Sequence, residues 1–284
     1  MLPEELIAQT PIEPRDSARL LVDSLTGIQH RHVSDIVEYL RAGDVLVVNH
    51  TRVLPARLKL KRRTGGAVEV LLLEERDADQ MQWEALVRPG GKLSPGEELL
   101  DNTGSVMLRI GQRTDAGDTF FVQFVASTHE DMMQRIMEDG EMPLPPYITT
   151  ALVDQSRYQT VFAHDQKSSA APTAGLHFTP ELLARIREAG VEIREVELVV
   201  GLDTFKPISV DNPLDHVIHT ESYRVPADTF DACLRARESG GRVIAIGTTA
   251  TRALESAATF VQLQGRTNLF ITPGYQWKVV DMMM

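Results

Sequence analysis

The strongest constraint on the fold of this chain is a change in its hydrophobic pattern near residue 57. Before that point strand-like and helix-like segments alternate: 33–40 has helical spacing behind a cap at Ser34, and 44–48 is a strand-sized apolar run. From 57 to 148 short alternating segments are separated by turn residues, which is typical of a small antiparallel sheet or barrel. The chain therefore combines two architectures.

The segments on either side of this region predict one shared domain. Within 57–148 we expect strands at 57–61, 68–73, 83–87, 106–110 and 119–125. After it, Thr179 and Pro180 begin a helix that Gly190 ends, followed by further segments at 191–200, 229–238, 242–246 and 249–258. The sequence predicts a three-layer α/β domain with a mixed sheet, formed by 1–56 and 149–284, and a small antiparallel β-barrel domain inserted at 57–148.

Charge and cysteine content limit the classes of function. The net charge of −11 argues against attraction to nucleic acid over the whole surface. The densest basic run ends in Lys61, Arg62 and Arg63, and we interpret it either as a local RNA-binding patch or as the solvated tip of a hairpin. With one cysteine, Cys233, no signal-like N-terminus and no apolar run of membrane-spanning length, we expect a cytoplasmic protein without a membrane partner.

The segment from Gly247 to Arg252 is the best ligand-loop candidate on physical grounds. It follows a predicted strand, and ligands of open α/β sheets bind beyond the carboxyl ends of strands. A glycine allows close backbone approach, and Thr248 and Thr249 place hydroxyls at a helix start. An ordinary capped junction between strand and helix would have the same sequence, so this alternative stays open.

Two further segments offer groups for proton transfer. His177 stands among small and apolar residues just before a helix start, either as an acid–base group or as a histidine packed in the core. Further on, His216, His219 and Glu221 form a second group; a helix there is doubtful, so we favour proton transfer over metal binding and expect no metal.

At these segments the sequence resembles the S-adenosylmethionine:tRNA ribosyltransferase-isomerase family. The matching segments follow one another in the family's order and cover nearly the whole chain, and Ala170-Ala-Pro-Thr-Ala-Gly-Leu-His-Phe178 is highly specific. The others are 2–9, 49–57, 143–148, 157–161, 216–221, 242–256 and 270–275.

The resemblance implies an α/β domain with an inserted β-barrel. It also implies transfer of the ribosyl part of S-adenosylmethionine to the aminomethyl-deazaguanine at the wobble position of tRNA, giving epoxyqueuosine and releasing adenine and methionine. S-adenosylmethionine is then a co-substrate, and no metal or further cofactor is expected. Since the sulfonium acidifies the adjacent ribose carbon, a modest base can remove that proton.

For this reaction we assign candidate roles to the residues of the matching segments. The acid–base candidates are His177, His219 and Glu221. The candidates for holding the substrates are Arg52, Thr173, Gly175, Gly247, Thr248, Thr249 and Arg252, and those for RNA are Lys61, Arg62 and Arg63. The sequence does not fix the oligomeric state, and a monomer is our expectation.

The chain departs from the family pattern at three internal positions. Val199 stands where relatives usually carry His, Asp203 where they carry Gly, and Lys167 where a Gly commonly precedes the specific segment. The printed sequence also ends at Met284, where the family pattern continues into a stretch containing Asn-Phe-His-Leu-Pro. These departures motivate one alternative, a divergent member that binds S-adenosylmethionine or RNA without the transfer. A second alternative, suggested by the acidic charge, is an unrelated sugar- or nucleotide-binding α/β enzyme.

Overall fold

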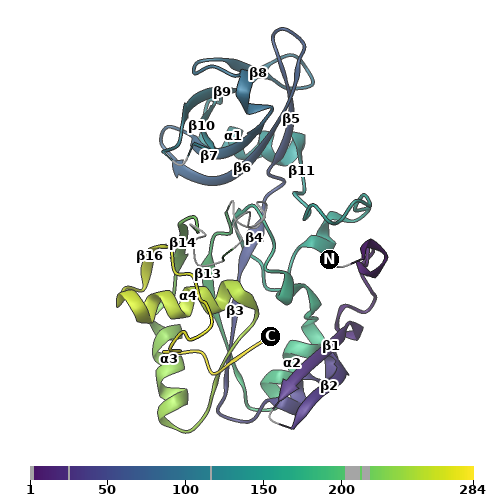
Figure 1. Ribbon diagram of the computed structural model, residues 1–284, viewed down its shortest axis with the longest axis vertical. Coiled ribbons are helices and arrows are strands. Elements are labelled where there is room, and N and C mark those ends of the chain that lie inside the picture. Colours follow the sequence, from purple (N-terminus) through teal and green to yellow (C-terminus); the bar gives the residue numbers. More distant parts are fainter. Residues whose placement is uncertain (1–2, 25, 116, 202–211, 213–217) are drawn as a thin grey trace.

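A computed structural model describes the arrangement of nearly the whole chain (Figure 1). It describes residues 3–24, 26–115, 117–201, 212 and 218–284. The expectations for Asp203 and His216 lie outside these residues.

The lower body of the molecule in Figure 1 is built on a mixed sheet. Its central strands run parallel to one another, and the two strands at one edge run antiparallel to their neighbours. In spatial order the strands are β16 (Gln264–Thr267), β14 (Glu221–Arg224), β13 (Glu192–Leu198), β3 (Val45–Asn49), β15 (Val243–Ala245) and β17 (Met282–Met283).

Helices cover both faces of this sheet because its central strands are apolar on both sides. On one face α3 (Ala227–Glu238) and α4 (Gly247–Phe260) pack against Val45 and Val47. On the other face α2 (Pro180–Glu188) and the 3-10 helix η3 (Val33–Tyr39) pack against Leu46 and Val48. The expected three-layer α/β arrangement with a mixed sheet is confirmed.

The upper body in Figure 1 is a closed antiparallel barrel. Strand β5 pairs with β6 along one side and with β8 at Lys61 and Arg62 on the other, and this second pairing closes the barrel. Met132 and Ile136 of the helix that follows are buried in the barrel core. The elements are β5 (Arg57–Arg62), β6 (Ala67–Asp77), β7 (Gln82–Arg88), β8 (Glu98–Leu100), β9 (Val106–Arg113), β10 (Phe120–Phe124), α1 (His129–Asp139) and β11 (Gly140–Glu141).

Polar side chains tie the barrel to the sheet. The hydroxyl of Ser169 donates to the backbone carbonyls of Leu72 and Leu73 in β6, at 2.7 and 2.8 Å. Arg266 of β16 donates to both carboxylate oxygens of Glu74 at 2.7 Å. The two bodies therefore meet close to the carboxyl ends of the sheet strands.

The remaining short elements belong neither to the six-stranded sheet nor to the barrel sheet. They are the hairpin β1 (Arg19–Ser24) and β2 (Gly27–His32), the parallel pair β4 (Thr51–Val53) and β12 (Asp165–Ser168), and the 3-10 helices η1 (Glu4–Leu6), η2 (Arg15–Ser17), η4 (Gly90–Lys92), η5 (Gln155–Tyr158) and η6 (Thr173–His177).

Local sequence signals are confirmed at some element ends and wrong at others. Thr179 caps α2, since its hydroxyl accepts from the amide of Leu182 at 3.1 Å. The cap expected at Ser34 is wrong: the segment is a 3-10 helix whose cap is His32, with the amide of His32 bonded to Asp35 at 2.9 Å. Ser34 lies inside the first turn of this helix, two residues after the residue that caps it.

A buried carboxylate, Asp44, lies where the sheet strands β3 and β15 begin, at the end of the sheet opposite their carboxyl ends. Asp44 is fully buried and accepts from the amide of Arg41 at 3.0 Å and from the guanidinium Nη2 of Arg242 at 2.6 Å. Burial alone would raise the pKa of Asp44, but these hydrogen bonds and the arginine charge outweigh it and lower the pKa. Asp44 therefore stabilises the fold as a carboxylate.

None of the described helices is long and apolar enough to cross a membrane.

Candidate active site

A pocket of about 430 Å³ opens at the carboxyl ends of the sheet strands, where α4 begins. We call it the Arg252 pocket. Leu198 and Val200 come from the end of β13, and Glu221 from the start of β14. The pocket has a polar side, formed by the threonines and Arg252 of α4, and an apolar side that includes the indole of Trp277. Its other lining residues are Ile218, Thr248, Thr249, Thr251, Leu269, Phe270, Ile271, Trp277 and Met283.

The start of α4 is shaped by a glycine that no other residue could replace easily. Gly247 has φ +85°, and a Cβ there would lie 3.2 Å from the Cβ of Ala174. Ala174 belongs to η6, in the centre of the Ala170–Phe178 segment. The segment Gly247–Arg252 is therefore packed against the segment Ala170–Phe178, and the absence of a side chain at Gly247 makes this contact possible.

Arg252 is held in place by neighbouring strands. Its Nη1 donates to the buried carboxylate of Glu221, and its Nη2 donates to the carbonyls of His219 and Thr267, both at 3.1 Å. The amide of Gly201 donates to the other oxygen of Glu221 at 2.8 Å. Both terminal nitrogens of the Arg252 guanidinium therefore already bond to protein.

Two buried donors in this pocket have no protein partner among the described residues. They are the hydroxyl Oγ1 of Thr249 and the Nε of Arg252. A buried polar group without a hydrogen bond costs about 1–3 kcal/mol, so such groups are uncommon without a ligand to satisfy them. These two atoms make the Arg252 pocket a candidate binding site for a molecule with acceptor atoms.

His219 and Glu221 lie two residues apart but contribute to different cavities. The imidazole Nε2 of His219 lies 3.3 Å from Asp118 of the barrel. His219 lines a cavity of about 330 Å³ together with Glu74, Arg76 and Thr220, where barrel and sheet meet. Its carbonyl bonds to Arg252, so this cavity adjoins the Arg252 pocket.

His177 lies on a different side of the specific segment. It is the last residue of the 3-10 helix η6, just before Thr179 caps α2. With Thr173 it lines an apolar groove of about 770 Å³ beside the N-terminal residues 8–19. Burial lowers the pKa of His177. The structure therefore does not bring His177 into the same cavity as His219 or Glu221.

Two other candidates for substrate binding have different surroundings from those expected. Gly175 is buried, and a Cβ there would lie 2.7 Å from the ring of Phe162, so its small size serves packing. Arg52 is exposed on β4 and lines none of the cavities described above. Its neighbour Asn49 has a structural role: its side-chain amide donates to the carbonyl of Leu198 at 3.0 Å and so fixes the end of β13.

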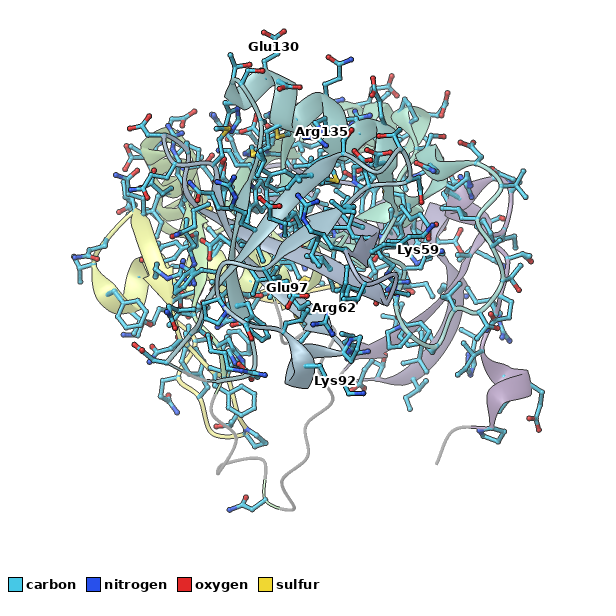
Figure 2. All side chains as sticks on the ribbon, turned by 90° about the horizontal axis from the view of Figure 1, so that it is seen from above. Lys59, Arg62, Lys92, Glu97, Glu130 and Arg135 are labelled. Atoms are coloured by element: carbon cyan, nitrogen blue, oxygen red, sulfur yellow. The ribbon has the colours of Figure 1, made fainter. Side chains whose placement is uncertain are left out.

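The basic run on the barrel is largely neutralised by carboxylates. Arg62 lies 2.5 Å from Glu97, and Arg63 lies 2.5 Å from Glu98. Figure 2 shows Arg62 and Glu97 next to each other, with Lys92 close by in this view. Lys61 is exposed and has no ion pair within the described part of the chain.

Sequence reasoning missed the apolar side of the Arg252 pocket and the pairing of Arg252 with Glu221. Trp277 is half exposed at the pocket. In the sequence, Trp277 stands two residues after the family-like segment 270–275, and this tryptophan was the signal that could have identified the apolar side of the pocket. The ion pair joins residues from β14 and α4, and no local pattern predicts such a contact.

Fold and site together define a class of protein: an α/β enzyme fold with an inserted closed β-barrel and a ligand pocket at the carboxyl ends of the strands. The family model of queuosine biosynthesis proteins matches residues 1–284. The chain belongs to this family, which contradicts the alternative of an unrelated sugar- or nucleotide-binding enzyme.

Several relatives share most of their length with this chain. The S-adenosylmethionine:tRNA ribosyltransferase-isomerase of Symbiobacterium thermophilum is 47% identical over 99% of this chain and 83% of its own length. The protein of the same name from Desulfitobacterium hafniense is 46% identical with the same coverage. A crystal structure of S-adenosylmethionine tRNA ribosyltransferase from Thermotoga maritima is 34% identical, with a TM-score of 0.49, over 100% of this chain and 81% of that one.

Proposed function

We propose that this protein transfers the ribosyl part of S-adenosylmethionine to the aminomethyl-deazaguanine wobble base of tRNA, giving epoxyqueuosine and releasing adenine and methionine. The match of residues 1–284 to the family supports the reaction. The observation that carries the assignment to a site is the pair of unpartnered buried donors in the Arg252 pocket, Thr249 Oγ1 and Arg252 Nε.

The Arg252 pocket suits the adenosyl part of S-adenosylmethionine. Its apolar side, with Trp277 and Phe270, offers surface for a planar base, and the two donors offer hydrogen bonds to ring nitrogens or ribose oxygens. Glu221 fixes the guanidinium of Arg252, so Nε keeps a defined direction. In this proposal Arg252 and Thr249 position the substrate, and Glu221 acts through Arg252.

The cavity at the junction of barrel and sheet suits the acceptor base. It adjoins the Arg252 pocket through His219, whose imidazole is the side chain most often used as a general base in enzymes. We propose that His219 removes the acidified ribose proton, after which adenine leaves, the substrate amine attacks the sugar, and the bond between the sugar carbon and sulfur breaks to release methionine. His177, in the separate apolar groove, remains a second acid–base candidate.

The location and partners of the protein follow from this substrate. Because tRNA is the acceptor, we propose that the protein acts in the cytoplasm and binds tRNA and S-adenosylmethionine. The exposed Lys61 and Arg52 are the proposed phosphate contacts that are least occupied by carboxylates. A monomer stays a prediction.

Adenine release from labelled S-adenosylmethionine in the presence of precursor-containing tRNA tests the proposal. Wild type should release adenine, and His219→Ala should lower the rate by about 10²–10⁴ while binding of S-adenosylmethionine is retained. His177→Ala is the matched control, since it removes an imidazole from a different cavity. A large loss only in His177→Ala would move the proton transfer to the groove.

Arg252→Lys separates positioning from simple charge. Lysine keeps the positive charge but has no Nε donor and cannot bridge Glu221 and two carbonyls. We expect weaker binding of S-adenosylmethionine and a raised KM. Unchanged kinetics would make Arg252 dispensable for substrate binding.

The alternative of a divergent member has an observation in its favour. Lys167, at a family glycine position, is accommodated by an ion pair to Glu197 at 3.0 Å, and Val199, at a family histidine position, is buried. Binding of S-adenosylmethionine without release of adenine in the same assay would support this alternative.

A further inference from the structure

A group of histidine and carboxylate side chains lies on the face of β13 opposite the Arg252 pocket. Side chains alternate along a strand, so Glu195 and Glu197 point away from Leu198 and Val200, which line that pocket. They meet two imidazoles, His50 from the end of β3 and His164 from the residue before β12. Nothing in the proposed reaction uses this group.

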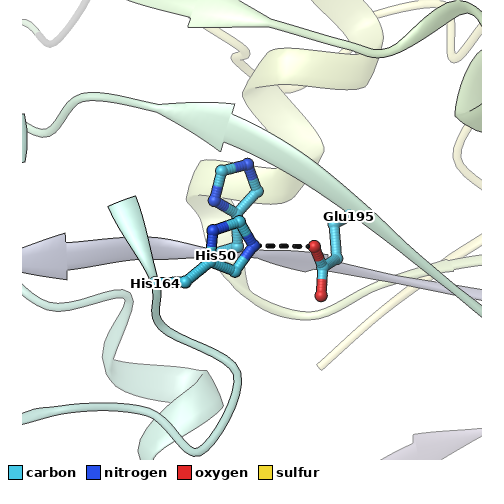
Figure 3. A group of neighbouring side chains, drawn as sticks. All are labelled: His50, His164 and Glu195. Carbon is cyan, nitrogen blue, oxygen red and sulfur yellow. Dashed lines mark hydrogen bonds and ion pairs between the residues drawn. The ribbon is translucent and has the colours of Figure 1, made fainter. Parts of the chain in front are cut away.

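The backbone holds the two histidines together. The amide of His50 donates to the carbonyl of Val196 at 3.1 Å, and the amide of His164 donates to the carbonyl of His50 at 3.1 Å. The imidazole rings stack with centroids 4.2 Å apart, and Figure 3 shows both rings close to the carboxylate of Glu195. His164 Nε2 lies 3.0 Å from Glu195 Oε2.

His50 is the member that a simple ion pair between His164 and Glu195 does not explain. It is 8% exposed, and its Nδ1 is buried with no hydrogen-bond partner among the described residues. A buried imidazole nitrogen without a partner points to a group that would satisfy it.

We propose that His50, His164 and Glu195 bind a divalent transition-metal ion such as zinc. One ligand atom from each lies within 4.8 Å of the other two. Tetrahedral zinc with bonds of about 2.0–2.1 Å separates its ligand atoms by roughly 3.4 Å. The 3.0 Å separation between His164 Nε2 and Glu195 Oε2 therefore opens slightly, and the separations to His50 close by about 1.4 Å at most. His164 and Glu195 are 56% and 44% exposed at the side chain and can make this movement, with His164 turning out of the ring stack.

The surroundings select these three ligands over their neighbours. Asp165 and Glu197 also lie near His50, but Lys167 Nζ is 3.9 Å and 3.0 Å from their carboxylates and repels a cation there. Asp165 has a different place in the site, because its Oδ1 lies 3.2 Å from His164 Nδ1. A carboxylate on the second nitrogen of a ligand histidine is the usual way such a ring is oriented.

Two histidines and one carboxylate leave a coordination position open. An adjoining cavity of about 450 Å³ is lined by His50, His164 and Glu195 and reaches Thr229 of α3. Three protein ligands with an open position are the arrangement of zinc sites that bind water or a small anion. The proposed ion is therefore accessible to a small oxygen ligand from this cavity.

Calorimetric titration of the tag-free, chelator-treated full chain with ZnCl₂ tests the proposal, without S-adenosylmethionine or tRNA present. We expect one equivalent bound with a Kd of about 1 μM or tighter, and the visible spectrum of four-coordinate Co²⁺ with CoCl₂. His164→Ala should weaken binding by more than the roughly 10- to 100-fold expected for Asp165→Asn. Because His164 is exposed, its removal leaves the fold intact, as thermal unfolding would verify.

His129→Ala is the matched control. His129 Nε2 lies 2.8 Å from Glu75, a pair that resembles that of His164 with Glu195 but has no third ligand among the described residues. This variant should bind zinc as wild type does. The proposal is overturned if wild type takes up no stoichiometric zinc, or if His164→Ala and Glu195→Gln bind as tightly as wild type. Either result is independent of whether adenine is released.

Discussion

Replacing Thr249 by valine should change stability and ligand affinity in opposite directions. The hydroxyl Oγ1 of Thr249 is buried at the start of α4 and has no partner among the described residues. Valine has nearly the same shape, so the substitution removes the hydroxyl without opening a cavity. Loss of an unsatisfied buried group removes a cost of about 1–3 kcal/mol, and we expect the free energy of unfolding to stay equal or rise by about 1 kcal/mol.

The same hydroxyl is expected to bond to S-adenosylmethionine in the complex. A neutral hydrogen bond contributes about 0.5–1.5 kcal/mol, so Thr249→Val should raise the Kd for S-adenosylmethionine roughly 2- to 13-fold. Thermal unfolding without ligand and calorimetric titration with S-adenosylmethionine measure the two effects separately. A loss of stability with unchanged affinity would refute the reasoning, since it would give the hydroxyl a structural partner and no ligand.

Thr251→Val provides the contrast on the same helix. The hydroxyl of Thr251 donates to the carbonyl of Gly247 at 3.0 Å, so valine there removes a bond that exists in the free protein. We expect Thr251→Val to lower the free energy of unfolding by about 1 kcal/mol. Equal stability changes in the two variants would mean that the substitution itself, and not the state of the hydroxyl, sets the result.

Two further predictions concern stability at acid pH and RNA binding. Asp44→Asn should lower the free energy of unfolding by about 3 kcal/mol at neutral pH, because it breaks the ion pair between the buried Asp44 carboxylate and the partly exposed Arg242. The folded pKa of Asp44 lies below its ordinary value of about 3.9. The stability that Asp44 contributes is therefore present above about pH 4 and is lost as the pH falls through the folded pKa. Denaturant unfolding should show the free energies of unfolding of the variant and wild type converging at that acid pH. For RNA, Lys61→Ser should reduce tRNA affinity and the salt slope of binding, whereas Arg62→Ser and Arg63→Ser should change both less, because those two already pair with carboxylates. Equal effects from all three would show that the carboxylates release the arginines to the RNA.

Much of the fold could be predicted from local patterns. The strand at 44–48 is confirmed as β3, and the barrel segments predicted at 68–73 and 106–110 lie within β6 and β9. Helix α1 was missed although its signal is local: Thr128 caps it, accepting from the amide of Asp131 at 3.1 Å. The division of the chain at residues 57 and 148 stays a proposal.

The sequence by itself determined most of the central strands and helices, and it identified residues that gather at the carboxyl ends of those strands. These features depend on hydrophobic spacing, capping hydroxyls and glycines, all of which act over a few neighbouring residues. It also pointed to Thr249 and Arg252, which line one pocket in the structure.

Only the tertiary structure decided which polar groups have partners. Arg252 meets Glu221 and Arg62 meets Glu97 because separate strands and helices bring them together, and those contacts change which charges remain free for a substrate. The convergence of His50 with His164 likewise joins positions more than a hundred residues apart in the chain. A contact of this kind depends on how the sheet is ordered, and hydrophobic spacing carries no information about which side chains will face one another across it.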